Sequence, residues 1–161
     1  MSSVGELLNW GRGELAFLGE PRARWEAERL LMDLGGWTRV GLILEHRQEA
    51  AEDIEVCFRE AVGRRLQRYP LAYLTGRAGF WNETLEVGPG CLVPRPETET
   101  LVERFIERSG FSEQDCFYFA DAGTGSGAIA VALLRHYRRA SAVLVDLSAA
   151  ALSIAARNAA R

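Results

Sequence analysis

The sequence contains no lysine, and all 19 of its basic residues are arginine. No apolar run approaches the roughly 18 residues that a membrane-spanning helix needs. The first residues, MSSVGELLNW, include an acid and lack the long apolar stretch of a secretory signal. We therefore expect a cytoplasmic protein that does not enter a membrane.

Cysteine and histidine are also scarce. Cys57, Cys91 and Cys116 are odd in number, lie far apart and form no Cys-x-x-Cys pair, and neither His46 nor His136 is near them in the sequence. This pattern indicates neither a zinc site nor a disulfide framework, so we expect no metal. The simplest expectation is three buried thiols.

Positive charge is not in excess either, since the net charge is −3. A protein that binds nucleic acid directly is usually basic, so the charge argues against that function. Two arginine clusters occur within helical patterns: Arg64, Arg65 and Arg68, and then Arg135, Arg138 and Arg139. We expect them on solvated helix faces, with contact to RNA or an acidic partner as the alternative.

Residues 1–70 have helical periodicity throughout, interrupted at Gly19 and at Gly35-Gly36. Pro21 suits the first turn of the second helix, and Thr38 suits the cap of the third. Four short helices with short connections predict a small antiparallel bundle. Apolar stripes are expected at Leu7, Leu8, Leu15 and Leu18, at Trp25, Leu30, Leu31 and Leu34, and at Ile54, Phe58, Ala61, Val62 and Leu66, with Trp10 and Trp37 also in the core.

The helical pattern stops before residues 71–95, broken by Pro70, Gly76 and Gly79. Within this segment, two short β-like runs flank Asn82-Glu83. We interpret this segment as a linker that contains a β-hairpin. Residues 96–161 then return to a helix, with Leu101, Val102, Phe105 and Ile106 as its apolar face, and from residue 117 they alternate strand, helix, strand and helix. The predicted fold class is α/β: a helical bundle, a hairpin linker, and the start of a Rossmann-like parallel sheet.

A glycine-rich segment, DAGTGSGAIA at residues 121–130, connects the first of these strands to its helix. Gly123, Gly125 and Gly127 allow a tight turn and a close approach of a ligand. Free N–H groups at the helix start would favour an anion or a carboxylate. Asp146 ends the next strand, where its carboxylate could accept hydrogen bonds from the two hydroxyls of a ribose.

The glycine pattern fits two cofactors. Gly123, Gly125 and Ala128 satisfy the dinucleotide pattern, which leaves an NAD(P)-dependent oxidoreductase as one reading. Asp121 favours the other, because a carboxylate beside the loop would attract the ammonium of a methionine group and repel a pyrophosphate. This comparison favours S-adenosylmethionine.

Four segments together resemble the HemK/PrmC family of protein-glutamine methyltransferases that act on peptide-chain release factors. They are PLAYLTGRAGFW, LVPRPETETLV, DAGTGSGAIA and VDLSAAALSIAARNA, and the resemblance runs from about Tyr69 to the end. The helical part fits the family's substrate-binding bundle but is less distinctive. One departure is Ala122, where the family usually has leucine.

The resemblance implies roles for individual residues. The segment Gly123, Thr124, Gly125, Ser126 and Gly127 would wrap the methionine part of the cofactor, with Asp121 near its ammonium. Asp146 would bind the ribose, and Leu147 would touch the adenine. Phe80 and the box Pro94, Arg95, Pro96, Glu97, Thr98 and Glu99 would line the pocket on the substrate side.

The family's substrate signature, Asn-Pro-Pro-Tyr, is missing, and no Asn-Pro dipeptide occurs anywhere in these 161 residues. We also count two strands after residue 117, where the family's sheet has about seven. We therefore interpret the chain as the N-terminal portion of a longer methyltransferase, inactive alone, weak or lacking in cofactor binding, and prone to self-association. A natural short form that serves as a non-catalytic binding module, and a methyltransferase of nucleic-acid amino groups, are the alternatives.

Overall fold

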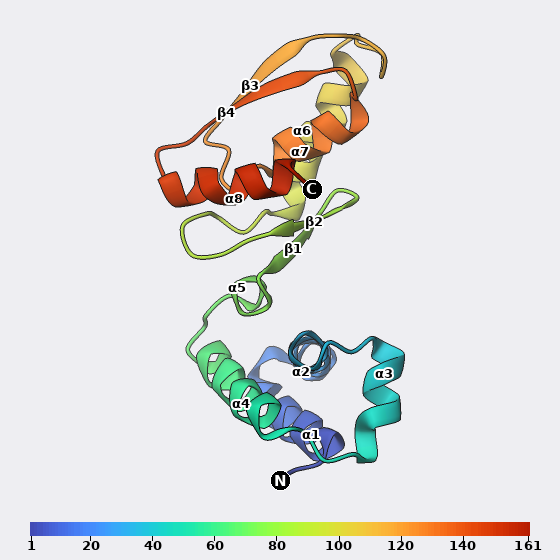
Figure 1. Cartoon of the computed structure of the whole chain (residues 1–161), viewed down its shortest axis with the longest axis vertical. Helices are drawn as coiled ribbons and strands as arrows, with labels where there is room; N and C mark the ends of the chain where they lie inside the picture. The colour runs from blue at the N-terminus through green and yellow to red at the C-terminus, as the bar shows by residue number, and fades with distance from the viewer. The chain divides into compact units, whose positions relative to one another are not determined.

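The computed structural model describes all residues from 1 to 161, and these form two compact units, Met1–Thr75 and Gly76–Arg161 (Figure 1). The first unit is entirely helical, and the second contains both strands and helices. None of the helices combines the length and the apolar character needed to pass through a bilayer. The α/β fold class predicted from the sequence is confirmed.

The first unit contains the four predicted helices and one further short helix. They are α1 (Val4–Glu14), α2 (Glu20–Gly35), α3 (Arg39–Leu44), α4 (Glu52–Leu66) and α5 (Leu71–Thr75), with 3-10 turns at Leu15–Leu18 and Glu45–Arg47. Helix α5 was not predicted, because Pro70 suggested a break in the pattern. The carbonyl of Pro70 instead accepts the N–H groups of Tyr73 and Leu74 and so starts the helix.

Side-chain caps fix where two of these helices begin. The Ser3 hydroxyl accepts the Glu6 N–H at 3.2 Å while the Glu6 carboxylate accepts the Ser3 N–H at 2.8 Å, which forms a capping box at α1. At α3, the Thr38 hydroxyl accepts the Gly41 N–H at 3.1 Å. The cap predicted at Thr38 is confirmed.

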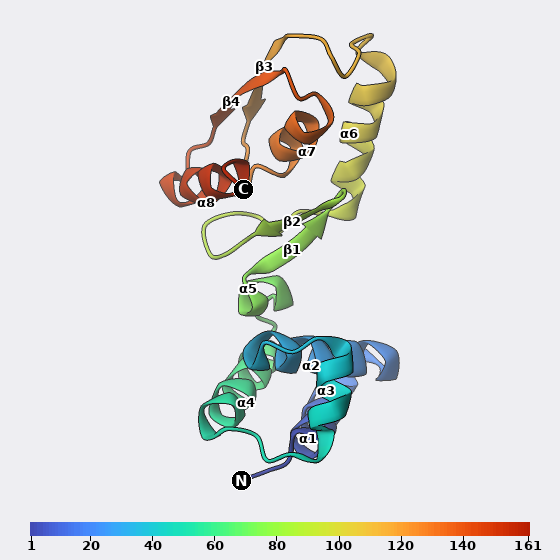
Figure 2. The ribbon, with the colours of Figure 1, turned by 45° about the vertical axis from the view of Figure 1, so that its right-hand side comes forward.

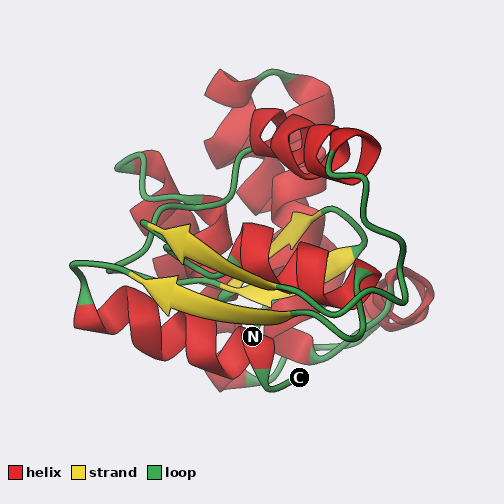
Figure 3. Ribbon diagram, turned by 90° about the horizontal axis from the view of Figure 1, so that it is seen from above, coloured by secondary structure: helices red, strands yellow, loops and turns green.

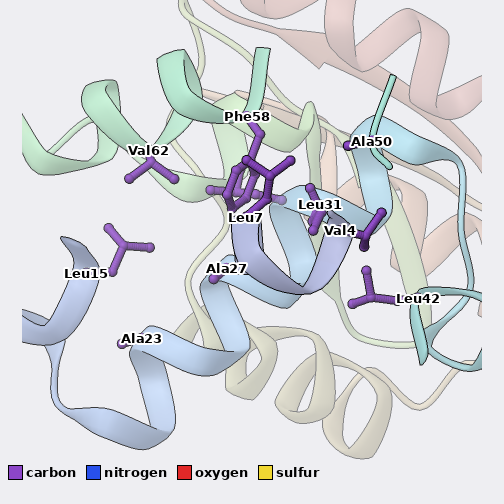
Figure 4. Close-up of a cluster of buried hydrophobic side chains, with 11 residues drawn as sticks. Val4, Leu7, Leu15, Ala23, Ala27, Leu31, Leu42, Ala50, Phe58 and Val62 are labelled. Carbon is purple, nitrogen blue, oxygen red and sulfur yellow. The ribbon is translucent and has the colours of Figure 1, made fainter. Parts of the chain in front are cut away.

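The core of the first unit lies where α1, α2 and α4 meet, and Figure 4 shows Leu7, Leu31 and Phe58 pointing into it. Trp10 and Trp37 are half-buried and pack against this core. The prediction for Trp25 was wrong, because its side chain is 57% exposed. The small residues Ala23 and Ala27 occupy the buried face of α2 instead, which allows its neighbours to approach closely. Leu34 and Leu66 are also exposed, so the prediction that they belong to the buried apolar stripes was wrong.

A buried ion pair joins α2 to α4. Arg65 donates from Nε to Glu26 Oε2 at 2.6 Å, and Glu26 is fully buried. Arg22 contacts the other oxygen of Glu26 at 2.9 Å. Arg65 therefore departs from the solvated face that we predicted for its cluster, because a charged side chain can be buried when its partner is buried with it. Arg64 and Arg68 remain exposed, each over an aromatic ring.

The second unit begins with the predicted hairpin, formed by β1 (Arg77–Phe80) and β2 (Glu83–Glu86), which pair antiparallel with Phe80 opposite Glu83. Helix α6 (Pro96–Arg108) follows, and the predicted alternation comes next: β3 (Tyr118–Ala122), α7 (Ala128–His136), β4 (Ser141–Val145) and α8 (Ala149–Ala159). Strands β3 and β4 run parallel (Figure 3). Their register places Tyr118 opposite Ser141. This βαβα order confirms the prediction of parallel strands.

Aromatic side chains form much of the core of this unit. Phe105 on α6 and Tyr137 at the end of α7 meet Phe117 edge-on or tilted, and Phe111 stacks on Phe117 with ring centroids 4.1 Å apart. Helix α7 lies between α6 and the β3–β4 strands (Figure 2). Leu101 is exposed on the outer side of α6, so the predicted apolar face is narrowed to Val102, Phe105 and Ile106.

The cysteines differ from the expectation of three buried thiols. Cys91 is buried, whereas Cys57 and Cys116 are exposed. Cys57 lies on the outer face of α4, one position before the buried Phe58, so the helical period turns its side chain away from the core. Cys116 lies in the loop before β3.

Candidate cofactor site

The loop between β3 and α7 is shaped by its three glycines. Gly123, Gly125 and Gly127 have φ angles of 77°, 57° and 79°. Residues with a β-carbon rarely adopt this left-handed region, so glycine is needed at each of these positions. The loop therefore leaves the end of β3, turns sharply and enters α7 within five residues.

Backbone N–H groups of this loop are bound to other parts of the protein. Gly123 and Thr124 both donate to the carbonyl of Val145, at 2.8 and 3.0 Å, and Gly127 donates to Thr124. Gly125 donates to the carboxylate of Asp146 at 2.8 Å. The end of β4 takes up three of these four donors, and a turn within the loop takes the fourth. Only Gly127 belongs to the start of α7, so the expectation of free N–H groups at the helix start fails for Gly127 and stays a prediction for the first residues of α7.

Asp146 lies directly after β4, at the tip of the strand as predicted. Its carboxylate accepts the N–H groups of Ser148 at 2.9 Å and of Gly125 at 2.8 Å. The two N–H groups favour the charged form and hold the pKa of Asp146 below its usual range. Two carboxylate oxygens can accept about four hydrogen bonds, so acceptor positions remain for two ribose hydroxyls.

A second carboxylate lies at the end of β3. The hydroxyl of Thr124 donates to Asp121 Oδ2 at 2.7 Å, and Thr124 itself is buried. This bond orients the carboxylate beside the loop while leaving its other oxygen for a cationic partner. Ser126 is also buried, so Thr124 and Ser126 support the loop from within.

The space outside the loop is open. A β-carbon built on Gly123 or Gly125 would meet no atom within 4 Å. Leu147, directly after Asp146, is fully exposed and free to cover a planar ring. Open backbone, two half-buried carboxylates and an exposed leucine suit a nucleoside that carries a cationic amino-acid group, so the residues present fit S-adenosylmethionine.

The residues predicted to line the substrate side of the pocket lie in the hairpin, at the start of α6 and just before it. The Phe80 ring is buried in the core, with 1% of its surface exposed. Pro96 occupies the first turn of α6, after Arg95 at the cap position, and Thr98 donates its N–H to the Arg95 carbonyl. Pro94 and Thr98 are half-buried and Glu97 is exposed. Their role in lining a pocket stays a prediction.

Glu99 has a contact that the sequence did not reveal. Its carboxylate accepts the N–H of Trp81 at 2.9 Å, and Trp81 turns the hairpin with a φ of 55°. Asn158, near the end of α8, was also missed. It is buried and bonds both to the glycine loop and to β2. The one available signal was a lone amide side chain within an alanine-rich helix.

Comparison with known proteins agrees with this arrangement. Residues 6–76 match the family model of the PrmC N-terminal domain, and this match covers the helical unit. Over most of its length, the chain is 42% identical to a release factor glutamine methyltransferase of Moorella thermoacetica, across 149 residues that cover 90% of this chain and 50% of that protein. Residues 6–76 therefore belong to the PrmC N-terminal domain family.

Two other relatives are also similar over most of the chain, both units included. A release factor glutamine methyltransferase of Geobacter sulfurreducens is 38% identical over 160 residues, covering 99% of this chain and 55% of that protein. One of Xylella fastidiosa is 41% identical over 145 residues, covering 90% and 52%. The chain thus spans about half the length of the curated PrmC relatives that it matches.

Proposed function

We propose that the chain binds S-adenosylmethionine as part of an enzyme that methylates the glutamine side-chain amide, in the GGQ motif, of peptide-chain release factors. Similarity to proteins named release factor glutamine methyltransferase supports the reaction. The geometry of the glycine loop and its two carboxylates supports S-adenosylmethionine as the cofactor. We expect the protein to act in the cytoplasm, where release factors work, and to make no direct contact with nucleic acid.

One observation favours S-adenosylmethionine over a dinucleotide. Loops that bind pyrophosphate do so with backbone N–H groups, and here the N–H groups of Gly123, Thr124, Gly125 and Gly127 are already bound within the protein. Asp121 adds a negative charge on the same side, which would repel a phosphate. The same carboxylate would attract the ammonium group of the methionine moiety.

The bound cofactor would supply an electrophilic methyl group on its sulfonium. A glutamine amide is a poor nucleophile because its lone pair is delocalised, so in-line positioning is the main requirement and can contribute roughly 7–11 kcal/mol. Within this chain, Asp121 and Asp146 would orient the two ends of the cofactor. The proton can leave after transfer, so no strong general base is needed.

We propose further that the helical unit docks the release factor, by analogy with the family whose N-terminal domain it matches. The 161 residues contain no Asn-Pro to hold the substrate amide. We therefore expect the chain alone to be inactive. Measurable transfer of labelled methyl groups from S-adenosylmethionine to a release factor by this chain would overturn that expectation.

Nitrogen-15 NMR titration of the chain tests the cofactor. At millimolar S-adenosylhomocysteine, we expect saturable shifts of the amides of Gly123, Gly125 and Leu147, with an affinity weaker than micromolar. NADH at the same concentration should leave these amides unchanged. Shifts with NADH alone would favour the oxidoreductase reading. No shifts with either ligand would contradict the proposal that this chain binds the cofactor.

A further inference from the structure

Asn158 joins three elements of the second unit through one buried side chain, of which 2% of the surface is exposed. Its Oδ1 accepts the N–H of Glu86 at 2.7 Å, and its Nδ2 donates to the carbonyl of Glu86 at 2.9 Å. The same Nδ2 donates to the carbonyl of Ser126, in the glycine loop, at 2.8 Å. The side chain therefore pairs with the last residue of β2 as a neighbouring strand would, and it also holds the loop.

Helix α8 is attached at its start to the segment after β2 and near its end to β2 itself. At its start, the Ser148 hydroxyl donates to the carbonyl of Gly90 at 3.1 Å. Near its end, Arg157 forms an ion pair with the Glu86 carboxylate at the surface, with Nη2–Oε1 at 2.6 Å. Of these contacts from α8, the one from Asn158 reaches the glycine loop.

An amide is the side chain that this position requires. Both donors of Nδ2 are used by carbonyls and Oδ1 is used by an N–H, so the polar atoms at this site are matched. Aspartate has the same shape, but it would place an acceptor oxygen against the carbonyls of Glu86 and Ser126. The Ser126 carbonyl would then lose a buried partner without access to water, because Ser126 is itself 2% exposed.

We propose that Asn158 is a positioning residue for the cofactor loop. By fixing the Ser126 carbonyl against β2, it sets the path of the loop between Gly125, whose N–H orients Asp146, and Gly127, which enters α7. The role in cofactor binding rests on the function proposed above. The role in fixing the loop rests on the hydrogen bonds alone.

The test compares N158D with R157Q. The second variant removes the exposed ion pair of the adjacent residue and leaves the loop contact in place. Hydrogen exchange is measured at the Gly125 and Gly127 N–H groups, with the Ser141 N–H, which donates to Phe117 at 3.0 Å in the β3–β4 region, as the reference for global opening. We expect N158D to speed exchange at the two loop positions about tenfold relative to Ser141, and R157Q to leave this ratio unchanged.

Cofactor affinity is measured for the same variants by NMR titration with S-adenosylhomocysteine. N158D should weaken binding about tenfold and R157Q should not. If N158D does not fold, N158A is measured in its place, since it removes the three bonds without adding a charge. Equal exchange ratios in the Asn158 variant and R157Q, or uniform acceleration at all three amides, would overturn the positioning role. Absence of binding by the unmodified chain would instead contradict the proposed function, and the exchange ratios would still decide the role of Asn158.

Discussion

At the scale of single residues, the glycines of the cofactor loop make different demands on space. A β-carbon at Gly127 would lie 3.1 Å from the β-carbon of Ala155, whereas one at Gly125 would meet nothing within 4 Å. Both residues have positive φ, so alanine at either adds conformational strain of about 1–2 kcal/mol. Alanine at Gly127 also forces α7 and α8 apart, which costs a further 1–3 kcal/mol or so.

We therefore expect G127A to lower the free energy of unfolding by about 2–5 kcal/mol and G125A by about 1–2 kcal/mol. G125A should nevertheless weaken binding of S-adenosylhomocysteine, because its methyl group would occupy the open side of the loop. Urea unfolding followed at amides of the second unit, together with ligand titration, measures both effects. Equal destabilisation by the two variants would show that the contact with Ala155 does not matter.

Glu55 links the first residues of the chain to α4. Its carboxylate accepts the Ser2 N–H at 3.0 Å and the Ser2 hydroxyl at 2.9 Å, and it pairs with Arg59 at 2.9 Å. These contacts lower the pKa of Glu55 to about 2. The hydrogen bond from the Ser2 N–H has the largest effect on this pKa, followed by the bond from Arg59. Because the folded pKa lies below the unfolded value of about 4.3, the stabilising effect is complete above that pH and disappears as the pH falls towards 2.

The expected result is a stability difference between the unmodified chain and E55Q that is largest at neutral pH and shrinks between about pH 4.5 and 2. Urea midpoints of the helical unit measured across this range give the comparison. E52Q, which changes an exposed acid at the start of the same helix, is the control and should show little pH-dependent difference. A stability difference between the unmodified chain and E55Q that stays constant at all pH values would show that the lowered pKa of Glu55 does not stabilise the helical unit.

At the scale of elements, Glu99 connects α6 to the β1–β2 hairpin. Its carboxylate supplies the acceptor for the Trp81 N–H at the turn. E99A should leave this partly buried donor without its charged partner and destabilise the second unit by about 1–3 kcal/mol. E97A, on the exposed side of the same first turn, is the matched control and should change stability by less than about 0.5 kcal/mol.

The measurement is urea unfolding, combined with the exchange rate of the Trp81 N–H. Faster exchange at Trp81 in E99A, with little change in E97A, is the expected outcome. Equal effects of the two substitutions would mean that Glu99 acts only as an acid in the first turn of a helix.

Local spacing explains why the elements and the glycine loop could be predicted. Helical and strand periods, the glycines and the acid after β4 all lie within short windows of the sequence. The buried pair Glu26–Arg65 and the contact of Glu99 with Trp81 join residues 39 and 18 positions apart. Asn158 reaches Glu86 across 72 positions. These contacts depend on how the helices and strands pack against one another. Helical and strand periodicity in the sequence does not determine that packing.

Trp25 shows a second limit of prediction from the sequence. A large apolar residue in phase with leucines suggests the core, yet α2 packs through small residues such as Ala27. Side-chain size therefore predicted the wrong buried face of α2. Helices that approach closely through small residues can gain more packing stabilisation than the burial of one large ring would supply. Arg65 was misplaced for the complementary reason, since its buried partner Glu26 lies on another helix.

At the scale of the whole molecule, the β3–β4 sheet has one uncovered face. Tyr118, Val143 and Val145 are 87%, 61% and 51% exposed, and the pairing register places them on the same side. Helices α7 and α8 lie on the other side (Figures 1 and 2). Parallel sheets are usually covered on both faces, and β3 and β4 pair only with each other, so each also leaves an outer edge unpaired.

This surface leads us to expect concentration-dependent self-association of the chain. V143K places a charge at the centre of the open face and should shift the chain towards monomer. V56K makes the same change at another exposed valine, on α4 in the helical unit, and should not. Sedimentation velocity over a hundredfold range of concentration compares the three proteins. A monomeric unmodified chain at the highest concentration, or equal dissociation by both variants, would show that the open face of the sheet does not drive association.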